Sequence, residues 1–193
     1  MPMPTQISVW DPMIRIFHWL LVIAFFTAYI IEDHILWLHV WSGYLITALI
    51  MLRLLWGLIG PHHARFDNFL QRPSLIVANL KDVFQLRAKR YTGHSPAGGA
   101  MIIALLTLLM ATTITGMVVY AGEKSAGPLW FYVHTWSNHT IEIYEDVHEV
   151  LSNITLGFIV VHIAAVLLLS GLHKEHLTLS MLTGKKKETA SES

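Results

Sequence analysis

The sequence predicts an all-α integral membrane protein, a bundle of four transmembrane helices with both termini in the cytoplasm. Composition is the first reason, because 54% of the 193 residues are hydrophobic and only 13% are charged, about half the charged share of a soluble domain. The second reason is that four apolar runs approach the ~20 residues that a helix needs to cross a bilayer. The third reason is the uneven distribution of lysine and arginine among the connections.

The four predicted spans share high hydrophobicity and suitable length, and they cover residues 13–31, 36–59, 97–120 and 143–171. Gly60 and Pro61 end the second span, because proline cannot continue a helix. Ser95 and Pro96 precede the third span as an N-cap and a first helical residue. Residues 1–11 lack the basic leader and cleavage site of a signal peptide, so we expect the first span to be retained. Residues 1–193 are therefore predicted to form a single membrane domain.

The connections differ in charge. The loop 61–96 contains six lysines and arginines, and the polar tail 172–193, expected to be disordered, contains four. Within the loop, residues 73–90 could form an amphipathic helix at the membrane surface. The connection 32–35 has no lysine or arginine, and the connection 121–142 has only Lys124. The positive-inside rule therefore predicts a multi-pass protein with the loop and both termini cytoplasmic and the two acidic connections facing the periplasm or the equivalent outer side.

Composition also restricts the chemistry. The chain has no cysteine, which excludes disulfides, thiolate metal sites, iron–sulfur clusters and covalent C-x-x-C-H haem attachment. Twelve histidines remain, so a metal or haem site must use imidazole. The net charge of zero, with neutral histidines, gives no argument for nucleic-acid binding.

Two histidines of the last span direct the functional prediction. His148 and His162 are fourteen residues apart, about 21 Å along a helix and within about 40° of one face. Ionisable residues inside a span are expensive and therefore indicate a functional site. With the predicted topology, His39 lies at the periplasmic depth of His148, and His18 lies at the cytoplasmic depth of His162. Four antiparallel spans could therefore present two histidine pairs, one near each membrane face.

Two imidazoles about 4 Å apart through one iron are typical of a six-coordinate b-type haem, whereas zinc requires more ligands than a single pair. Gly43 follows His39 on the same helical face and could leave a flat surface for a porphyrin. Arg15 and Arg53 could bind haem propionates near the cytoplasmic ends of their spans. The alternatives are that small residues such as Gly43, Gly116 and Gly157 serve helix packing and that the arginines reach the interface.

The remaining histidines have less specific roles. His34 competes with His39 but lies in a connection. His94 could reach a propionate, while His62 and His63 could meet a quinone headgroup or be solvated. His134 and His139 could cover the periplasmic face, and His173 and His176 are expected at the interface. No role is assigned to His62, His63, His94, His134 or His139.

These residues resemble a known family. The segments Arg15-Ile-Phe-His18-Trp and His39-Val-Trp-Ser-Gly43-Tyr, with His148 and His162 on the last span, are similar to the prokaryotic cytochrome b561 family, which is related to the cytochrome b subunits of nickel–iron hydrogenases. The resemblance covers about residues 9–187. It implies two b haems, each bound by two histidines of spans one, two and four, which are His18, His39, His148 and His162 in this sequence. The long basic loop 61–97 departs from a minimal member of the family and leaves the partner in doubt.

The resemblance implies electron transfer between membrane quinones and a c-type cytochrome, a hydrogenase or another redox protein, which would make the chain an electron carrier or the membrane subunit of an oxidoreductase. A homodimer is an open option. A superoxide:quinone oxidoreductase is the first alternative, and the acids near His39 and His148 argue against it because they would repel superoxide. A transporter or metal channel without haem is the second alternative.

Overall fold

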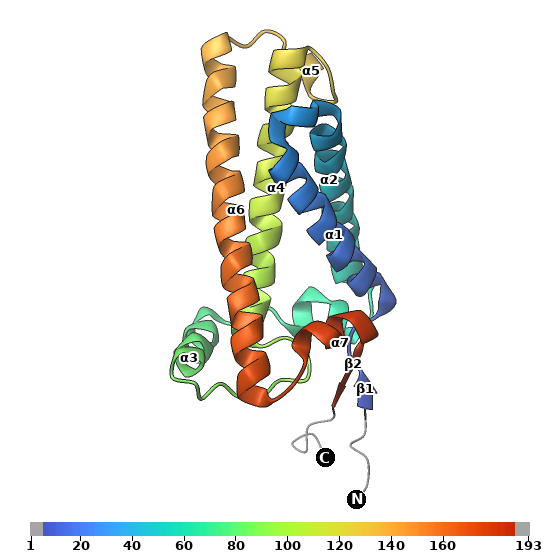
Figure 1. The fold of residues 1–193 in the computed structure, drawn as a ribbon, viewed down its shortest axis with the longest axis vertical. Coiled ribbons are helices and arrows are strands. Elements are labelled where there is room, and N and C mark those ends of the chain that lie inside the picture. Colours follow the sequence, from blue (N-terminus) through green and yellow to red (C-terminus); the bar gives the residue numbers. More distant parts are fainter. Residues whose placement is uncertain (1–5, 188–193) are drawn as a thin grey trace, which may run out of the picture. The chain divides into compact units, whose positions relative to one another are not determined.

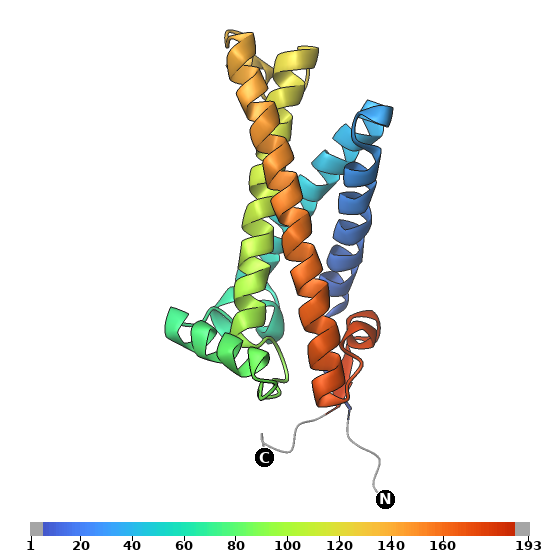
Figure 2. The same cartoon turned by 60° about the vertical axis from the view of Figure 1, so that its left-hand side comes forward.

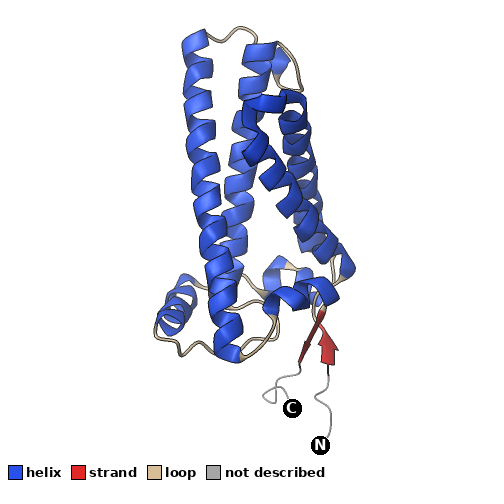
Figure 3. Cartoon of the chain, in the orientation of Figure 1, coloured by secondary structure: helices blue, strands red, loops and turns tan. Residues whose placement is uncertain are grey.

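A computed structural model describes residues 6–187, except for the side chains of Gln6, Asp33, His63 and Lys187. The N-terminal residues 1–5 and the end of the predicted polar tail, residues 188–193, lie outside the described residues. Helices dominate the described chain (Figure 3). Four of them are long and apolar enough to cross a membrane, and they are α1 (Pro12–Ile31), α2 (Leu36–Ile59), α4 (Pro96–Lys124) and α6 (Asn138–His173). The predicted all-α membrane fold is confirmed.

Shorter elements lie between the long helices and at the two ends of the described chain (Figure 1). They are the 3₁₀ helices η1 (Glu32–Ile35), η2 (His62–Ala64) and η3 (Phe66–Asn68), the helices α3 (Pro73–Phe84), α5 (Trp130–Val133) and α7 (Leu177–Thr183), and the strands β1 (Gln6–Ser8) and β2 (Lys185–Lys187).

The chain divides into two compact units, each built from parts of the long helices. Unit 1 comprises Met1–His18, Leu52–Ile103 and Val160–Ser193, and unit 2 comprises Trp19–Met51 and Ala104–Ile159. His18, His162, Arg15 and Arg53 belong to unit 1. His39, His148 and Gly43 belong to unit 2. Both predicted histidine pairs therefore lie within single units.

The ends of the helices have local causes. Ser95 accepts a hydrogen bond from the Gly98 amide at 3.1 Å, which confirms the predicted N-cap of α4. The fourth span starts at Asn138, five residues before the predicted position, because Ser137 caps it by accepting the Thr140 amide at 3.2 Å. The acidic residues of its first turns had made this region resemble a loop.

Helix α3 begins at Pro73, where the surface helix was predicted, but it ends at Phe84 instead of residue 90. Leu86 adopts a left-handed conformation with φ 57°, and the Arg87 amide donates to the Asp82 carbonyl at 2.8 Å. This pattern is a Schellman motif, which terminates a helix. Figure 2 shows α3 next to the start of α4. The buried Asn79 joins the two helices by accepting the Ala97 amide at 3.2 Å.

The segment expected to be a polar tail contains α7 and β2. Strand β2 pairs antiparallel with β1, with Ile7 opposite Lys186 (Figure 1). Gly184 makes the turn between α7 and β2 with φ 81°, a conformation that favours glycine. The described ends of the chain therefore meet in unit 1.

Candidate functional site

In unit 2, His39 and His148 lie close together. Their ring centroids are 6.1 Å apart and their ring planes make an angle of 78°. Imidazole–metal bonds of about 2 Å on both sides of one metal would separate two ring centroids by roughly 6 Å. The angle between the planes is no obstacle, because each ring can rotate about its bond to the metal.

Main-chain carbonyls fix the tautomer of both rings. Nδ1 of His39 lies 3.0 Å from the Ala28 carbonyl oxygen, and Nδ1 of His148 lies 2.8 Å from that of Thr112. A carbonyl oxygen can only accept, so Nδ1 carries the proton in each ring. Nε2 then keeps its lone pair, which is the arrangement of histidines that bind metals. Each ring can therefore offer Nε2 to a metal.

Two glycines shape the space around this pair. A Cβ atom added to Gly43 would meet nothing within 4 Å, so the helical face next to His39 is open. A Cβ atom added to Gly116 of α4 would lie 2.7 Å from Cε1 of His148. Gly43 thus leaves room for a flat ring system, and Gly116 provides the surface on which the imidazole rests.

In unit 1, His18 and His162 are half-buried and lie within electrostatic range of each other. Among the described residues, no cluster of three or more histidine, aspartate or glutamate side chains could hold a metal ion. Paired imidazoles without carboxylates suit an iron porphyrin, which supplies four of the six iron ligands itself, better than zinc.

Both predicted arginines have buried nitrogens in unit 1. Arg53 is 4% exposed, and its guanidinium carbon lies 4.7 Å from the centroid of the Phe66 ring. Asp11 is within electrostatic range of Arg53. Nη1 of Arg15 donates to the Leu182 carbonyl in α7. Within the described part of the chain, Nη1 of Arg53 and Nε of Arg15 are buried and have no hydrogen-bond partner. A buried cation with unsatisfied donors favours an anionic ligand.

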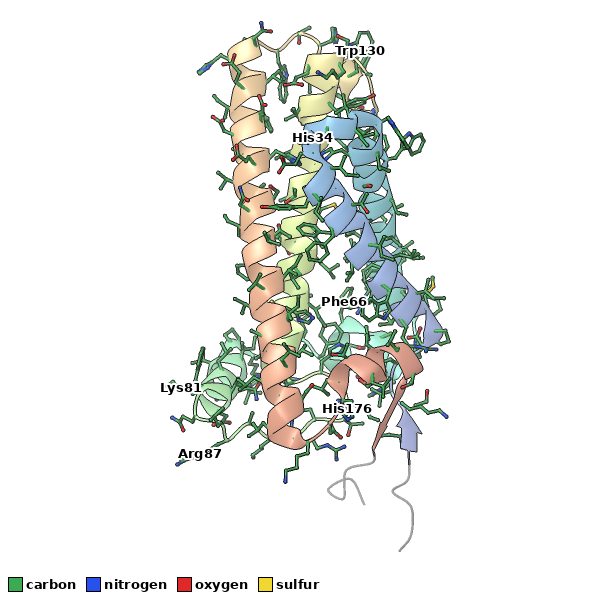
Figure 4. All side chains as sticks on the ribbon, viewed as in Figure 1. His34, Phe66, Lys81, Arg87, Trp130 and His176 are labelled. Atoms are coloured by element: carbon green, nitrogen blue, oxygen red, sulfur yellow. The ribbon has the colours of Figure 1, made fainter. Side chains whose placement is uncertain are left out.

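The other histidines are dispersed. His34 in η1 lies beside the Ile31 carbonyl (Figure 4), and His94 packs between Trp10 and Phe69, with centroids 4.6 and 4.8 Å away. His134 lies beside the Phe131 carbonyl, and His173 beside that of Ala88. His62 and His139 are exposed, and the side chain of His63 is not among those described.

A groove of about 420 Å³ lies between the end of α6 and α7 in unit 1. Figure 4 shows His176 at the junction of these helices. The groove is lined by three leucines and three polar residues, namely Leu167, Leu179, Leu182, Ser170, His176 and Thr178.

Sequence reasoning missed the groups that hold His148. Thr112 and Thr115 lie in α4, for which no site residue was predicted because this helix contains no histidine. The signal that could have found them is the run Thr112-Thr-Ile-Thr115-Gly116, since three threonines and a glycine in five residues are unusually polar and small for the middle of an apolar span.

Paired imidazoles that offer Nε2 within an all-α membrane fold are the arrangement expected of a membrane b-type cytochrome. Residues 9–184 match the family of prokaryotic cytochrome b561, and the chain belongs to that family. It is also similar to the probable Ni/Fe-hydrogenase B-type cytochrome subunit of Rhizobium leguminosarum bv. viciae, with 22% identity over 216 aligned positions that cover 94% of this chain and 89% of that protein. The chain is thus a multi-pass prokaryotic membrane protein of the b-type haem cytochromes, and its function is transmembrane electron transfer.

Proposed function

We propose that the chain carries two b haems and transfers electrons across the bacterial inner membrane between quinone and a protein redox partner. His39 and His148 bind the haem of unit 2, and His18 and His162 bind the haem of unit 1. The observation that carries this proposal is the geometry of His39 and His148, whose rings lie 6.1 Å apart with both Nδ1 atoms beside main-chain carbonyls. A bound haem would supply an iron that exchanges one electron, and ligation by two imidazoles would leave that iron no open coordination position.

Arg53 and Arg15 bind the propionates of the unit 1 haem in this proposal. Their buried nitrogens without partners support it, because carboxylates would form charge-assisted hydrogen bonds with them. Gly43 accommodates the edge of the unit 2 porphyrin, which the open space beside it supports.

The loop 61–96 and both termini face the cytoplasm in this proposal, and the two acidic connections face the periplasm. Unit 1 contains twelve of the thirteen lysines and arginines, in accord with the positive-inside rule. In unit 2, the first turns of α6 expose the carboxylates of Glu142, Glu145, Asp146 and Glu149. Negative charge attracts a basic partner and repels superoxide. We therefore infer a basic c-type cytochrome as the partner of this face. The name of the Rhizobium protein makes a hydrogenase the alternative partner.

We infer that a quinone headgroup binds in the groove between α6 and α7. The groove lies in unit 1, as do His18 and His162, and leucines and polar groups line it. Ser170 accepts the Leu177 amide at 3.3 Å, so its own hydroxyl hydrogen can donate to a quinone oxygen. His176 can supply or accept the proton that quinone chemistry requires.

The purified full-length protein provides the main test. Its reduced-minus-oxidised spectrum should show a b-type band, with about two haems per chain, and His148→Ala and His162→Ala should each remove about one of them. A colourless protein would instead support the transporter or metal channel. Retention of both haems in both variants would reject these ligands.

The quinone site has its own test. His176→Ala should raise the KM for a water-soluble quinol several-fold without changing haem content, because His176 touches the groove and no haem ligand depends on it. Gln85→Ala is the matched control, since Gln85 is also exposed in unit 1 but lies outside the groove. An unchanged KM in His176→Ala would mean that the quinone binds outside this groove.

A further inference from the structure

We propose that α4, the span without histidine, positions His148 through Gly116 and tunes the unit 2 haem through Thr115. This inference rests on the proposed function, because it assigns roles to residues that act through a proposed haem ligand. Four hydrogen-bonding or packing contacts from α4 and α6 carry it, and all of them lie within unit 2.

Gly116 sets the position of the imidazole. An ideal Cβ at residue 116 would lie 2.7 Å from Cε1, 3.1 Å from Nδ1 and 3.4 Å from Nε2 of His148. Three atoms of one ring within 3.4 Å mean that the imidazole lies against the Gly116 backbone. Any larger residue would have to push the ring away from α4, and Nε2 would move with it.

Thr115 places a second oxygen beside Nδ1 of His148. Its Oγ1 lies 3.2 Å from Nδ1, in addition to the Thr112 carbonyl at 2.8 Å. The Thr115 hydroxyl can donate to the Ala111 carbonyl at 3.0 Å, which turns an oxygen lone pair toward the imidazole. The Nδ1 proton can then be shared between two acceptors.

A buried contact between α4 and α6 holds this arrangement in place. Thr155 lies seven residues after His148 on the same face of α6 and is 0% exposed. Its hydroxyl is 3.4 Å from that of Thr112, and each hydroxyl also donates to a carbonyl of its own helix, at 2.9 Å for Thr112 and 2.7 Å for Thr155. The small side chains let the two helices approach closely.

The two proposed ligands of unit 2 therefore differ in the hydrogen-bond acceptors beside Nδ1. Within the described part of the chain, the Ala28 carbonyl lies beside Nδ1 of His39, whereas the Thr112 carbonyl and the Thr115 hydroxyl both lie beside Nδ1 of His148. Hydrogen bonds to the remote nitrogen raise the basicity of a metal-binding imidazole. A more basic ligand stabilises ferric iron, so the Thr115 hydroxyl should make the unit 2 haem harder to reduce.

The role of Thr115 is tested by redox titration of the full-length, haem-loaded protein. Thr115→Val should raise the ratio of reduced to oxidised unit 2 haem at a fixed potential about threefold, which corresponds to about 28 mV at 59 mV per tenfold change for one electron. Thr115→Ser should restore the wild-type titration. Thr113→Val is the matched control, because Thr113 is also buried but its hydroxyl donates to the Met110 carbonyl of its own helix instead of lying beside His148.

The role of Gly116 is tested by haem affinity and by electron paramagnetic resonance of the ferric protein. Gly116→Ala should weaken haem binding to unit 2 at least about tenfold, the loss typical of disturbed ligand orientation, and should shift the low-spin signal of any haem that remains. Gly157→Ala adds the same methyl group in unit 2 where nothing lies within 4 Å, and it should leave both readouts unchanged.

His148→Ala distinguishes a wrong ligand assignment from a wrong assignment of the roles of α4. If it removes one haem while Thr115→Val matches Thr113→Val and Gly116→Ala matches Gly157→Ala, the roles of α4 are overturned and the ligand assignment stands. If His148→Ala retains both haems, the ligand assignment fails, and the inference fails with it.

Discussion

The two units of this chain have opposite charge. Unit 1 contains twelve of the thirteen lysines and arginines and six of the thirteen acids, a net charge of +6, whereas unit 2 contains one and seven, a net charge of −6. The net charge of the whole chain is zero, so the average conceals the difference. In a helical membrane protein, charge is informative when it is counted at each end of the spans.

The units also differ in the side chains of their proposed haem sites. In unit 2, main-chain carbonyls orient the imidazoles of His39 and His148. In unit 1, Arg53 is buried with an unsatisfied Nη1 among the described residues. Unit 2 thus has two imidazoles oriented by main-chain carbonyls, whereas unit 1 has a buried cation that an anionic group would neutralise.

The largest expected effect is haem loss in double histidine variants, which distinguish the sites of the two units. We expect His39→Ala with His148→Ala to remove the same single haem as either change alone, because both act on one site. His148→Ala with His162→Ala should remove both haems, because the changes fall in different units. Pyridine haemochrome assay of haem per chain measures this. Loss of both haems in the first double variant, with the fold retained by circular dichroism, would reject the pairing.

Arg53→Met should have opposite effects with and without haem. In the haem-free protein, removal of a buried charge whose Nη1 has no hydrogen-bond partner among the described residues should stabilise unit 1 by about 1 kcal/mol or more. Loss of the cation–π contact with Phe66 and of the attraction to Asp11 offsets part of this gain. In the haem-loaded protein, the change should weaken haem retention, because a propionate loses its partner. Thermal unfolding of both forms measures the effect.

Arg65→Met is the control for Arg53→Met. Arg65 is exposed and pairs with Asp67 at 2.6 Å, and an exposed pair contributes only about 0–1 kcal/mol. Its loss should have a small effect of the same sign in both forms. An Arg53→Met protein that is destabilised without haem would show that Asp11 and the aromatic rings already satisfy the guanidinium.

Much of the fold follows from the sequence because hydrophobicity acts locally. The second span, predicted at residues 36–59, coincides with α2. The start of α6 was displaced because residues 138–142, Asn-His-Thr-Ile-Glu, are mostly polar and precede the apolar run of the span. The pairing of β1 with β2 escaped prediction, since it joins residues about 180 positions apart and three lysines in a row carry no strand signal.

The candidate site shows the same limit. Matching depths predicted His39 with His148, and their rings lie 6.1 Å apart. The acceptors of Nδ1 could not be predicted, because the carbonyls of Ala28 and Thr112 carry no side-chain signal and their positions depend on how the helices pack. Gly116 was noticed as a small residue, but its contact with His148 is a property of the fold.

Neutralising the acids of unit 2 should sharpen the charge comparison. Replacing Glu142, Glu145, Asp146 and Glu149 with glutamine should slow electron transfer to a basic c-type cytochrome by about tenfold at low salt, and the difference should shrink as salt increases. Stopped-flow kinetics at several ionic strengths measures this. The same variant should react faster with superoxide if that anion can reach the site. An unchanged rate with the cytochrome would exclude this face for the partner.

The smallest expected effect concerns Lys186 of β2, the strand that pairs with β1 in unit 1. Its Nζ donates to the Tyr91 and Thr92 carbonyls, both at 3.1 Å. Burial lowers the pKa of Lys186 below its usual 10.5, Glu175 opposes this shift, and Arg90 adds to it. The unfolded chain therefore binds more protons than the folded chain between the lowered pKa and 10.5, so the contribution of Lys186 to stability increases as the pH rises through this window.

Lys186→Met isolates this contribution, because other groups titrate alike in both proteins. The difference in unfolding free energy between the wild type and Lys186→Met should widen from pH 8 to pH 10 in favour of the wild type. Neutral Lys186 keeps two N–H groups for the two carbonyls, so its bonds survive deprotonation while the cost of burying a charge disappears. A difference that narrows over this range would mean that the electrostatic attraction of Glu175 outweighs burial, and Glu175→Gln should then reverse the trend.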